Sequence, residues 1–408
     1  MNLLTVDTIE QARLKISEKI KSWPVKTKTI PLGQALGYTL AEDMISPCDI
    51  PSFRRSTVDG YAVTAADTCA AADSIPVFLK LAGSVQMGKP AGFSIRAGEC
   101  AYVPTGGMLP GGADAVVMAE YCEQITENSA AVYESAAEGA GTVQEGEDIQ
   151  KGKIFLKGGI TLRPQEIGAL AAAGITNIPV FSPASLSIIS TGDELVPPDR
   201  EPATGEIRDV NTYAVKSLAE KYGYNVLSAG FLPDDEQKLE TAVREAAAAS
   251  DIVIICGGSS KGEKDYTAAI VGRIAKPGVF TRGLAVKPGK PAILGWDEQS
   301  KTLFAGLPGH PVSAMIVFTL IFCQPPFRCS SNLSHPVPAR ISSNIPGSPG
   351  KTVCQPVSLS LKDGLYTAEP VFGKSGMITT LTRADGYIII ELNKEGLKKD
   401  ESVMVYLF

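Results

Sequence analysis

The 408-residue sequence contains few of the side chains that bind soft or borderline metal ions. It has two histidines, His310 and His335, and none of its eight cysteines forms a CxxC pair. Because clusters of cysteine and histidine hold most structural zinc ions, we expect no metal site with nitrogen or sulfur ligands. Scattered, unpaired thiols are typical of proteins that work in a reducing cytoplasm.

The sequence also lacks a membrane-spanning segment and an excess of basic residues. The apolar stretch "SAMIVFTLIFC" at 313–323 has about half of the 20 or so residues that a spanning helix needs. The beginning, "MNLLTVDTIEQARLKISEKI", has no signal-peptide core. The net charge is −6, whereas nucleic-acid-binding proteins usually carry a basic surface. We therefore expect a cytoplasmic protein with no membrane or nucleic-acid partner.

The composition is that of a globular protein, and the pattern of helix-like and strand-like segments changes along the chain. Hydrophobic residues make up 44% and charged residues 20%, and 40 glycines and 28 prolines are spread throughout, which predicts several domains with many turns. The spacing predicts helices over 7–21, with Asp7 as N-cap, and over 162–175. Residues 47–146 are predicted to be β-rich, and the sequence from 324 onward indicates a small β-barrel or sandwich.

From residue 183 the sequence alternates between strand-like and helix-like runs. The strand-like runs are "LSIIS", "YNVLSAG" and "DIVIIC", and the helix-like runs are "NTYAVKSLAEKYG", "DEQKLETAVREAAAAS" and "PVSAMIVFTLIF". This alternation favours a parallel sheet with helices on both faces. Such sheets bind ligands beyond the carboxyl ends of their strands. Here the strand-like runs are followed by "TGDEL", "FLPDDE" and "GGSSKGEKD". The glycines either let main-chain amides approach a phosphate or simply form a tight turn, and both explanations stay open.

Nine stretches of the chain, in the same order, resemble the molybdopterin molybdenumtransferases, the MoeA family, which includes the C-terminal domain of gephyrin. These stretches are "STVDGYAV", "VPTGGMLPGGADAVV", "GEDIQKG", "LRPQEIGALAAAGI", "STGDEL", "GGSSKGEKDYT", "VKPGKP", "GLPGHPVS" and "GKSGMITTLTRADGYIII".

The resemblance implies a multidomain fold of the α/β plus β class, and the changes in the helix-like and strand-like pattern along the chain agree with it. It implies an elongated homodimer, whose active site lies between the α/β domain of one subunit and the β-rich domain of the other. The expected parts are a discontinuous helical linker domain (1–46 and 147–178), an inserted β-rich domain (47–146), an α/β molybdopterin-binding domain with a parallel-type sheet (179–325) and a C-terminal β-barrel (326–408).

The reaction implied by the resemblance is the insertion of molybdenum into adenylylated molybdopterin. Molybdate and Mg²⁺ are used, and the products are molybdenum cofactor and AMP. The expected partners are a second copy of the chain, molybdopterin and molybdate, with the molybdopterin adenylyltransferase as a further candidate. The alternatives are the adenylyltransferase activity itself, which would not need the "VDGYA" domain, and a non-catalytic, gephyrin-like scaffold, which would not need the carboxylates. Molybdate and tungstate are not distinguished.

The resemblance assigns site roles position by position. The implied catalytic residues are Asp59, Thr105, Asp148, Glu194, Asp234 and Asp265, with Glu194 and Asp265 as metal ligands. The implied substrate-binding residues are Ser190, Thr191, Gly192, Gly257, Gly258, Ser259, Ser260, Lys287, Lys290 and Pro308.

Structural roles remain open for several of these residues. Asp59 precedes a glycine, which is a turn signal, and Asp148 could cap a turn. Asp234 could cap the helix that begins near Asp235, and Asp193 could brace its loop instead of contacting a ligand.

The sequence departs from the family pattern at a few positions in these stretches. Lys261 stands where an apolar residue is usual, His310 where asparagine is commonest, and Val58 where methionine is usual. None of these changes removes a carboxylate, but Lys261 and His310 leave the ligand preference open.

Overall fold

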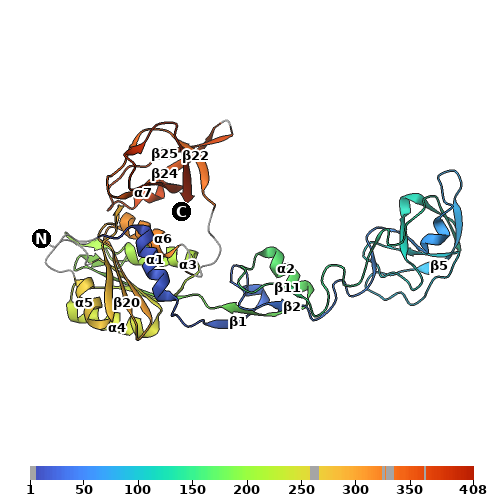
Figure 1. The fold of residues 1–408 in the computed structure, drawn as a ribbon, viewed down its shortest axis with the longest axis horizontal. Coiled ribbons are helices and arrows are strands. Elements are labelled where there is room, and N and C mark those ends of the chain that lie inside the picture. The colour runs from blue at the N-terminus through green and yellow to red at the C-terminus, as the bar shows by residue number, and fades with distance from the viewer. Residues whose placement is uncertain (1–5, 258–265, 324–326, 328–334, 363) are drawn as a thin grey trace. The chain divides into compact units, whose positions relative to one another are not determined.

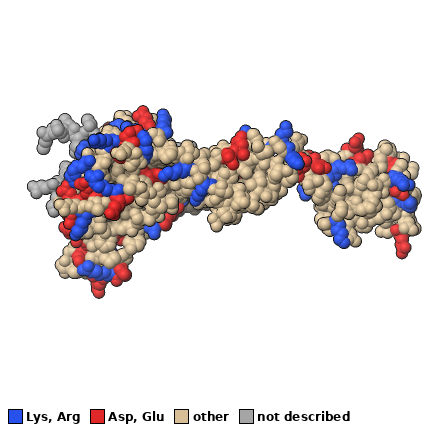
Figure 2. All heavy atoms as spheres, turned by 90° about the horizontal axis from the view of Figure 1, so that it is seen from below, with Lys and Arg blue, Asp and Glu red and all other residues tan. Residues whose placement is uncertain are grey.

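The computed structural model describes residues 6–257, 266–323, 327, 335–362 and 364–408. The chain folds into two compact units, one of Met1–Lys28 with Phe181–Phe408 and one of Thr29–Val180 (Figure 1). Acidic and basic side chains are interspersed over the face shown in Figure 2. Among the predicted site residues, Gly258, Ser259, Ser260 and Asp265 lie outside the described residues, as does Lys261.

The first unit contains a six-stranded sheet that is parallel on one side and antiparallel on the other. Its first four strands run parallel, as the strand-helix alternation predicts, and two antiparallel strands extend it. The order is β16 (Asn225–Leu232), β13 (Ser185–Thr191), β17 (Ile252–Cys256), β21 (Thr302–Leu307), β20 (Ile293–Asp297) and β18 (Pro277–Arg282).

Helices cover both faces of this sheet, and the alternation of side chains along its strands explains why. Ile188 and Ile254 belong to one hydrophobic core and Ile189 and Ile255 to the other, because successive strand residues point to opposite faces. One face packs α1 (Ile9–Ile20), α3 (Asn211–Lys221) and α6 (Pro311–Phe322), and the other packs α4 (Glu236–Ala249) and α5 (Tyr266–Ile274).

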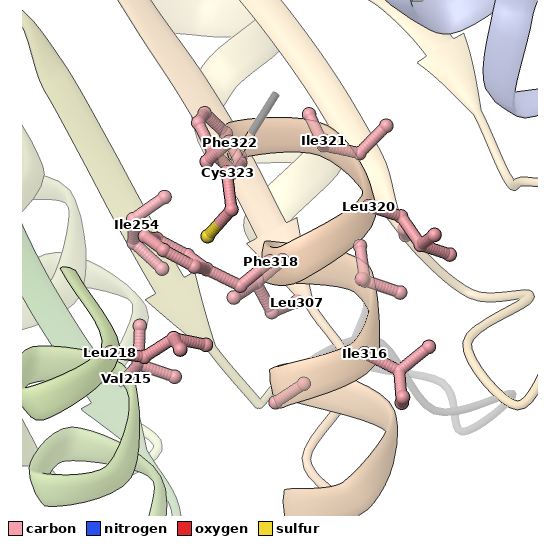
Figure 3. Packing of buried hydrophobic residues seen from close by; sticks show 14 of the residues in the cluster. Val215, Leu218, Ile254, Leu307, Ile316, Phe318, Leu320, Ile321, Phe322 and Cys323 are labelled. Atoms are coloured by element: carbon pink, nitrogen blue, oxygen red, sulfur yellow. The ribbon is translucent and has the colours of Figure 1, made fainter. Parts of the chain in front are cut away.

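Helix α6 is apolar on all sides because it is surrounded by other elements. Figure 3 shows Phe318 directed toward Ile254 of β17, while Ile316 and Leu320 lie on the other side of the helix. The rings of Phe318 and Phe322 stack at 5.1 Å between centroids. A helix that is apolar all round belongs in a core. No helix in the described part of the chain is long and apolar enough to cross a membrane.

The N-cap of helix α1 lies one residue later than the sequence predicts. It is Thr8, which forms a capping box with Gln11, so the prediction of Asp7 as the cap is wrong. The Asp7 carboxylate instead accepts hydrogen bonds from Lys15 at 2.7 Å and from the Thr281 hydroxyl at 2.5 Å. Helix α1 belongs to the first unit, whereas the helix of the 162–175 stretch belongs to the second. Helix α1 packs on α6, and its Arg13 guanidinium donates to the Leu320 carbonyl oxygen of α6.

The end of the chain forms a five-stranded closed barrel within the first unit. The ring is β24 (Thr352–Lys362), β25 (Leu365–Pro370), β22 (Val337–Ile341), β28 (Ser402–Leu407) and β26 (Gly386–Ile390), which pairs back with β24. The short strand β19 (Val286–Lys287) adds to β24 from outside. Closure leaves no unpaired strand edge in the ring, and Val357, Ile388 and Val405 fill its interior.

The second unit contains another six-stranded sheet and a smaller helical part. The sheet confirms the β-rich prediction, with the order β7 (Ala115–Met118), β4 (Gly60–Val63), β6 (Glu99–Val103), β5 (Val77–Ser84), β9 (Ser129–Val132) and β8 (Cys122–Thr126). Helix α2 (Pro164–Ala172) begins with a capping box between Arg163 and Glu166. Short strand pairs join β2 (Met44–Ile45) to β11 (Ile154–Leu156) and β3 (Arg55–Ser56) to β10 (Thr142–Val143).

Candidate active site

A cavity of about 1110 Å³ opens beyond the carboxyl ends of the parallel strands in the first unit. Each of the four parallel strands leads into it, because the carboxyl ends of parallel strands meet at one edge of a sheet. The predicted residues in its lining are Ser190, Thr191, Glu194, Asp234, Gly257 and Pro308. The parallel topology thus brings together side chains that lie more than a hundred residues apart.

Asp234 is held in the cavity by residues at and just after the end of strand β13. The Thr191 hydroxyl donates to Asp234 Oδ1 at 2.5 Å, and the Asp234 main-chain N–H donates to Asp193 Oδ1 at 3.0 Å. The N-cap of α4 is Asp235, whose carboxylate accepts from the amides of the first helical turn. Asp234 is therefore not the helix cap, and Asp193 braces the loop.

The glycine at the end of β17 is needed for packing between strand ends. Gly257 has φ +107°, and a Cβ there would lie 2.4 Å from the Thr191 carbonyl oxygen. Its N–H donates to the Leu307 carbonyl oxygen at 3.2 Å and is not available to an anion. Gly257 is thus fixed by packing, and the choice between a phosphate loop and a tight turn stays open for the glycine stretch as a whole. A Cβ on Gly192 would lie 2.7 Å from Glu194 Oε2, so the Glu194 carboxylate rests against the main chain of Gly192.

The buried serine, threonine and cysteine side chains beside these glycines are neutral. The Ser190 and Thr212 hydroxyls share a hydrogen bond of 2.7 Å. Burial, helped by the charge of Asp209 and opposed by a hydrogen bond with Ser190, raises the pKa of the Cys256 thiol to about 12. Cys256 therefore remains a thiol at neutral pH and supplies neither a nucleophilic thiolate nor a metal ligand.

A small parallel strand pair brings a second polar segment to the cavity. Strand β14 (Leu195–Val196) pairs with β15 (Ile207–Arg208), and the Ile207 N–H donates to the Glu194 carbonyl oxygen at 2.7 Å. Sequence reasoning missed the cavity-lining residues of this segment, Glu206, Arg208, Asp209 and Asn211. The signal was the stretch "GEIRDVN", which places charged and amide side chains directly before a predicted helix.

Other predicted binding residues occupy different surroundings. Lys287 and Lys290 are not among the residues that line the cavity, and Lys287 lies in β19 beside Val353 of the barrel. His310 does line it, and its ring Nδ1 is 2.8 Å from the Ser375 hydroxyl. The histidine at the family's usual asparagine position thus joins the α/β sheet region to the barrel.

The second unit holds two of the predicted carboxylates, Asp59 and Asp148. Asp59 Oδ1 accepts the Thr105 main-chain N–H at 2.8 Å, and both residues are exposed. Asp148 lines a separate hollow of about 530 Å³, and within the described residues it makes no hydrogen bond to Asp59 or Thr105. The turn that Asp59 begins therefore also positions Thr105, while Asp148 stands apart.

The cavity's chemistry fits a hard cation. Its lining carboxylates are Glu194, Glu206, Asp209 and Asp234, and Mg²⁺ usually takes one or two carboxylates together with water and substrate phosphates. Among the described residues no group of three Cys, His, Asp or Glu side chains is placed to hold a metal ion by itself. Glu194 and Asp234 could therefore supply part of a Mg²⁺ site that a phosphorylated ligand completes.

This combination of an α/β sheet with a cavity at its strand ends, a closed barrel and a β-rich unit corresponds to three regions of one protein family. Residues 187–328 match a probable molybdopterin binding domain. Residues 7–174 match the MoeA N-terminal region (domain I and II), and residues 338–408 match the MoeA C-terminal region (domain IV).

Whole-chain comparisons agree with the regional matches. The molybdopterin molybdenumtransferase of Haemophilus influenzae is 35% identical over 311 residues, which cover 76% of this chain and 74% of the relative. That of Nostoc sp. is 30% identical over 93% of this chain and 88% of its own length. A crystal structure of a molybdopterin biosynthesis MoeA protein from Pyrococcus horikoshii aligns with a TM-score of 0.82 and 34% identity over 99% of both chains. The chain belongs to the MoeA family.

Proposed function

We propose that this protein inserts molybdenum into adenylylated molybdopterin, using molybdate and Mg²⁺ and releasing molybdenum cofactor and AMP. The observation that carries the proposal is the strand-end cavity, in which Glu194 and Asp234 face a volume of about 1110 Å³. Ligand cavities for molecules of drug size and cofactors span roughly 300–1,000 Å³, so this one has room for a pterin joined to a nucleotide. The names of the relatives from Haemophilus influenzae and Nostoc supply the activity.

The residues of the cavity suit a reaction that depends on positioning. Cleavage of a phosphoanhydride needs its phosphates held in place and their charge neutralised. Thr191 fixes one oxygen of Asp234, which leaves the second oxygen to face the ligand. Glu194 lies against the main chain of Gly192. These two carboxylates, with Asp265 as a further ligand, would hold Mg²⁺, and the ion would neutralise charge on the substrate's phosphates.

The proposal includes a homodimer in which a second copy completes the site. Within the described residues, every residue that lines the cavity belongs to the first unit, whereas Asp59, Thr105 and Asp148 belong to the second. Asp59 and Thr105 form one exposed, hydrogen-bonded pair, and an exposed pair can be presented to another subunit. Lys287, Lys290, Pro308 and the residues Gly258–Ser260 are proposed to contact the substrate.

The same proposal places the protein downstream of a molybdopterin adenylyltransferase, because that reaction produces the adenylylated substrate. A cytoplasmic location accords with the free cysteines in the described part of the chain, since thiols stay reduced there.

Incubation of the protein with adenylylated molybdopterin, Mg²⁺ and molybdate tests the function. We expect AMP release and cofactor formation together, with both reduced at least tenfold in Asp234→Asn. A reaction without molybdate serves as the control. AMP formation without any cofactor would contradict the proposal, and so would the absence of both products, which is the result expected of a scaffold. Consumption of ATP to adenylylate free molybdopterin would assign the adenylyltransferase activity instead.

A further inference from the structure

The lining of the strand-end cavity is acidic, although the proposed substrates are anions. Glu194, Glu206, Asp209 and Asp234 all line it, and Arg208 is the single lysine or arginine that the described part of the lining contains. A phosphate or molybdate that enters a negatively charged cavity needs a positive group to offset its repulsion by the carboxylates. Arg208 is the described residue that can supply this charge.

The main chain and one side-chain hydrogen bond fix the position of Arg208. It ends strand β15, where it pairs with Val196 of β14. Its Nε donates to the Arg200 carbonyl oxygen at 3.1 Å. Its two amino groups, Nη1 and Nη2, have no hydrogen-bond partner within the described residues. The guanidinium is thus anchored by one edge and presents its other donors, an arrangement that suits an oxyanion.

Glu206, two residues before Arg208, is already paired with another arginine. Arg200 Nη2 donates to both oxygens of Glu206, at 2.9 and 3.0 Å, and the Ala203 N–H donates to Glu206 Oε2 at 2.9 Å. No salt bridge of the described chain includes Arg208. The charge of Glu206 is therefore compensated, and that of Arg208 is not.

The neighbouring residues supply a second, independent observation. Asp209 is 4% exposed, and its Oδ1 accepts the Thr212 N–H, while its Oδ2 has no partner within the described chain. Asn211 donates from Nδ2 to the Gly309 carbonyl oxygen at 2.7 Å, and its Oδ1 is buried without a donor. Buried acceptors that lack a donor are costly, so this segment suits a ligand that brings N–H or O–H groups.

We propose that Arg208 binds the phosphoryl group of a nucleoside monophosphate unit, with the hydroxyl or amine groups of that unit directed toward Asp209 and Asn211. A nucleotide carries both an oxyanion and hydrogen-bond donors, whereas molybdate offers only the oxyanion. The proposal rests on the proposed function, because the adenylyl group of the substrate is this nucleotide. It deepens that function by assigning the nucleotide end to the β15 segment of the cavity.

Calorimetric titrations with AMP, adenosine and molybdate test the proposal. In Arg208→Gln we expect the Kd for AMP to rise about tenfold, the loss of one charge-assisted contact, with the Kd for adenosine changed less than twofold. Arg208→Lys keeps the charge and should recover part of the AMP affinity. Arg383→Gln is the matched control, because Arg383 is also exposed and anchored through Nε, to the Thr379 carbonyl oxygen, but lies outside the cavity lining.

The other outcomes separate the explanations. An unchanged Kd for AMP in Arg208→Gln overturns the nucleotide assignment, and a loss of molybdate binding in that variant would show that the guanidinium serves the other oxyanion. Equal weakening of AMP and adenosine, or weakening in Arg383→Gln, overturns the proposal as a general disturbance, and thermal unfolding of each variant identifies a folding defect. A wild-type protein that binds AMP through Arg208 but inserts no molybdenum would refute the proposed function alone.

Discussion

Two of the predicted carboxylates, Asp234 in the α/β sheet region and Asp59 in the β-rich region, each accept a hydrogen bond from a threonine. The two hydrogen bonds differ in kind. In the α/β sheet region, Asp234 accepts the side-chain hydroxyl of Thr191, and both residues line a large cavity. In the β-rich region, Asp59 accepts the main-chain N–H of Thr105, and both residues are exposed.

The difference follows from topology. Parallel strands end at the same edge, so residues forty or more positions apart meet and support one another there. In the β-rich sheet the two loops around Asp59 and Thr105 are joined by main-chain hydrogen bonds between β4 and β6. The first arrangement can enclose a ligand. The second presents its side chains outward, which suits a residue that acts on a neighbouring subunit.

Replacement of one glycine in each region should show the largest difference between the two regions in the free energy of unfolding. In Gly257→Ala the new Cβ would lie 2.4 Å from the Thr191 carbonyl oxygen at φ +107°, and we expect a loss of about 3 kcal/mol in the free energy of unfolding. Gly106, beside Thr105, has φ +80°, with its nearest neighbour, Met87 Cε, at 3.5 Å. Alanine there should cost about 1 kcal/mol.

Tryptophan fluorescence during chemical denaturation can separate the two glycine variants. Both tryptophans, Trp23 and Trp296, belong to the first unit. The fluorescence transition should therefore move in Gly257→Ala and remain in place in Gly106→Ala. Equal shifts in the two variants would contradict the view that the strand ends are the more tightly packed region.

Removal of the threonine hydroxyls should give a smaller effect and sharpen the comparison. Thr191→Val deletes the donor to Asp234 and should cost about 1–2 kcal/mol of stability. Thr105→Val leaves the main-chain bond to Asp59 intact and should change stability by less than about 0.5 kcal/mol, although activity should fall in both variants. Denaturation curves and AMP release measure the two quantities. A large loss of stability in Thr105→Val would show that its hydroxyl is structural.

The smallest effect is expected at the opposite end of the same strands. Burial raises the pKa of the Asp251 carboxyl, but hydrogen bonds from Lys26 and Ser185 outweigh burial and bring the pKa below its ordinary value of 3.8. The stability that this group contributes is therefore complete above its unfolded pKa and is lost as the pH falls through the lower, folded pKa.

Asp251→Asn should accordingly lower the free energy of unfolding by about 0.5–1 kcal/mol at pH 7, a modest amount because Lys26 is half exposed. The difference from wild type should disappear as the pH falls below the folded pKa. Denaturation curves between pH 7 and pH 2 measure it. A difference that stays constant over this range would mean that the carboxylate charge is not what stabilises the strand end.

Hydrophobic periodicity and turn residues were sufficient to predict the main layers of the fold. The run "DIVIIC" became the buried strand β17, and "PVSAMIVFTLIF" became α6, because a continuous apolar run has to be covered on every side. The antiparallel strands β18 and β20 were not predicted. The predicted N-cap of α1 was wrong by one residue, because the Asp7 carboxylate accepts hydrogen bonds from Lys15 and Thr281. Thr281 is distant in sequence, so the local sequence does not show this contact.

The candidate site was predicted where chemistry follows a strand directly and missed where it comes from a separate segment. Glu194 and Asp234 come just after strand-like runs, so their convergence could be expected. Arg208 and Asp209 reach the cavity only because β15 pairs with β14, and two-residue strands leave no periodic signal. Lys287 lies in a strand that extends the barrel and is not in the described cavity lining, so its contact with the substrate stays a prediction.

The central proposal is a homodimer in which the cavity of one subunit works with Asp59 of the other, and mixing two inactive variants tests it most directly. Asp59→Ala and Glu194→Ala should each lose most AMP release and cofactor formation. After subunit exchange at equal concentrations, half of the dimers are mixed and each has one intact site, so activity should return to roughly a quarter of wild type. A mixture that exchanges subunits, as shown by differently tagged chains, yet stays as inactive as its parents would contradict a shared site.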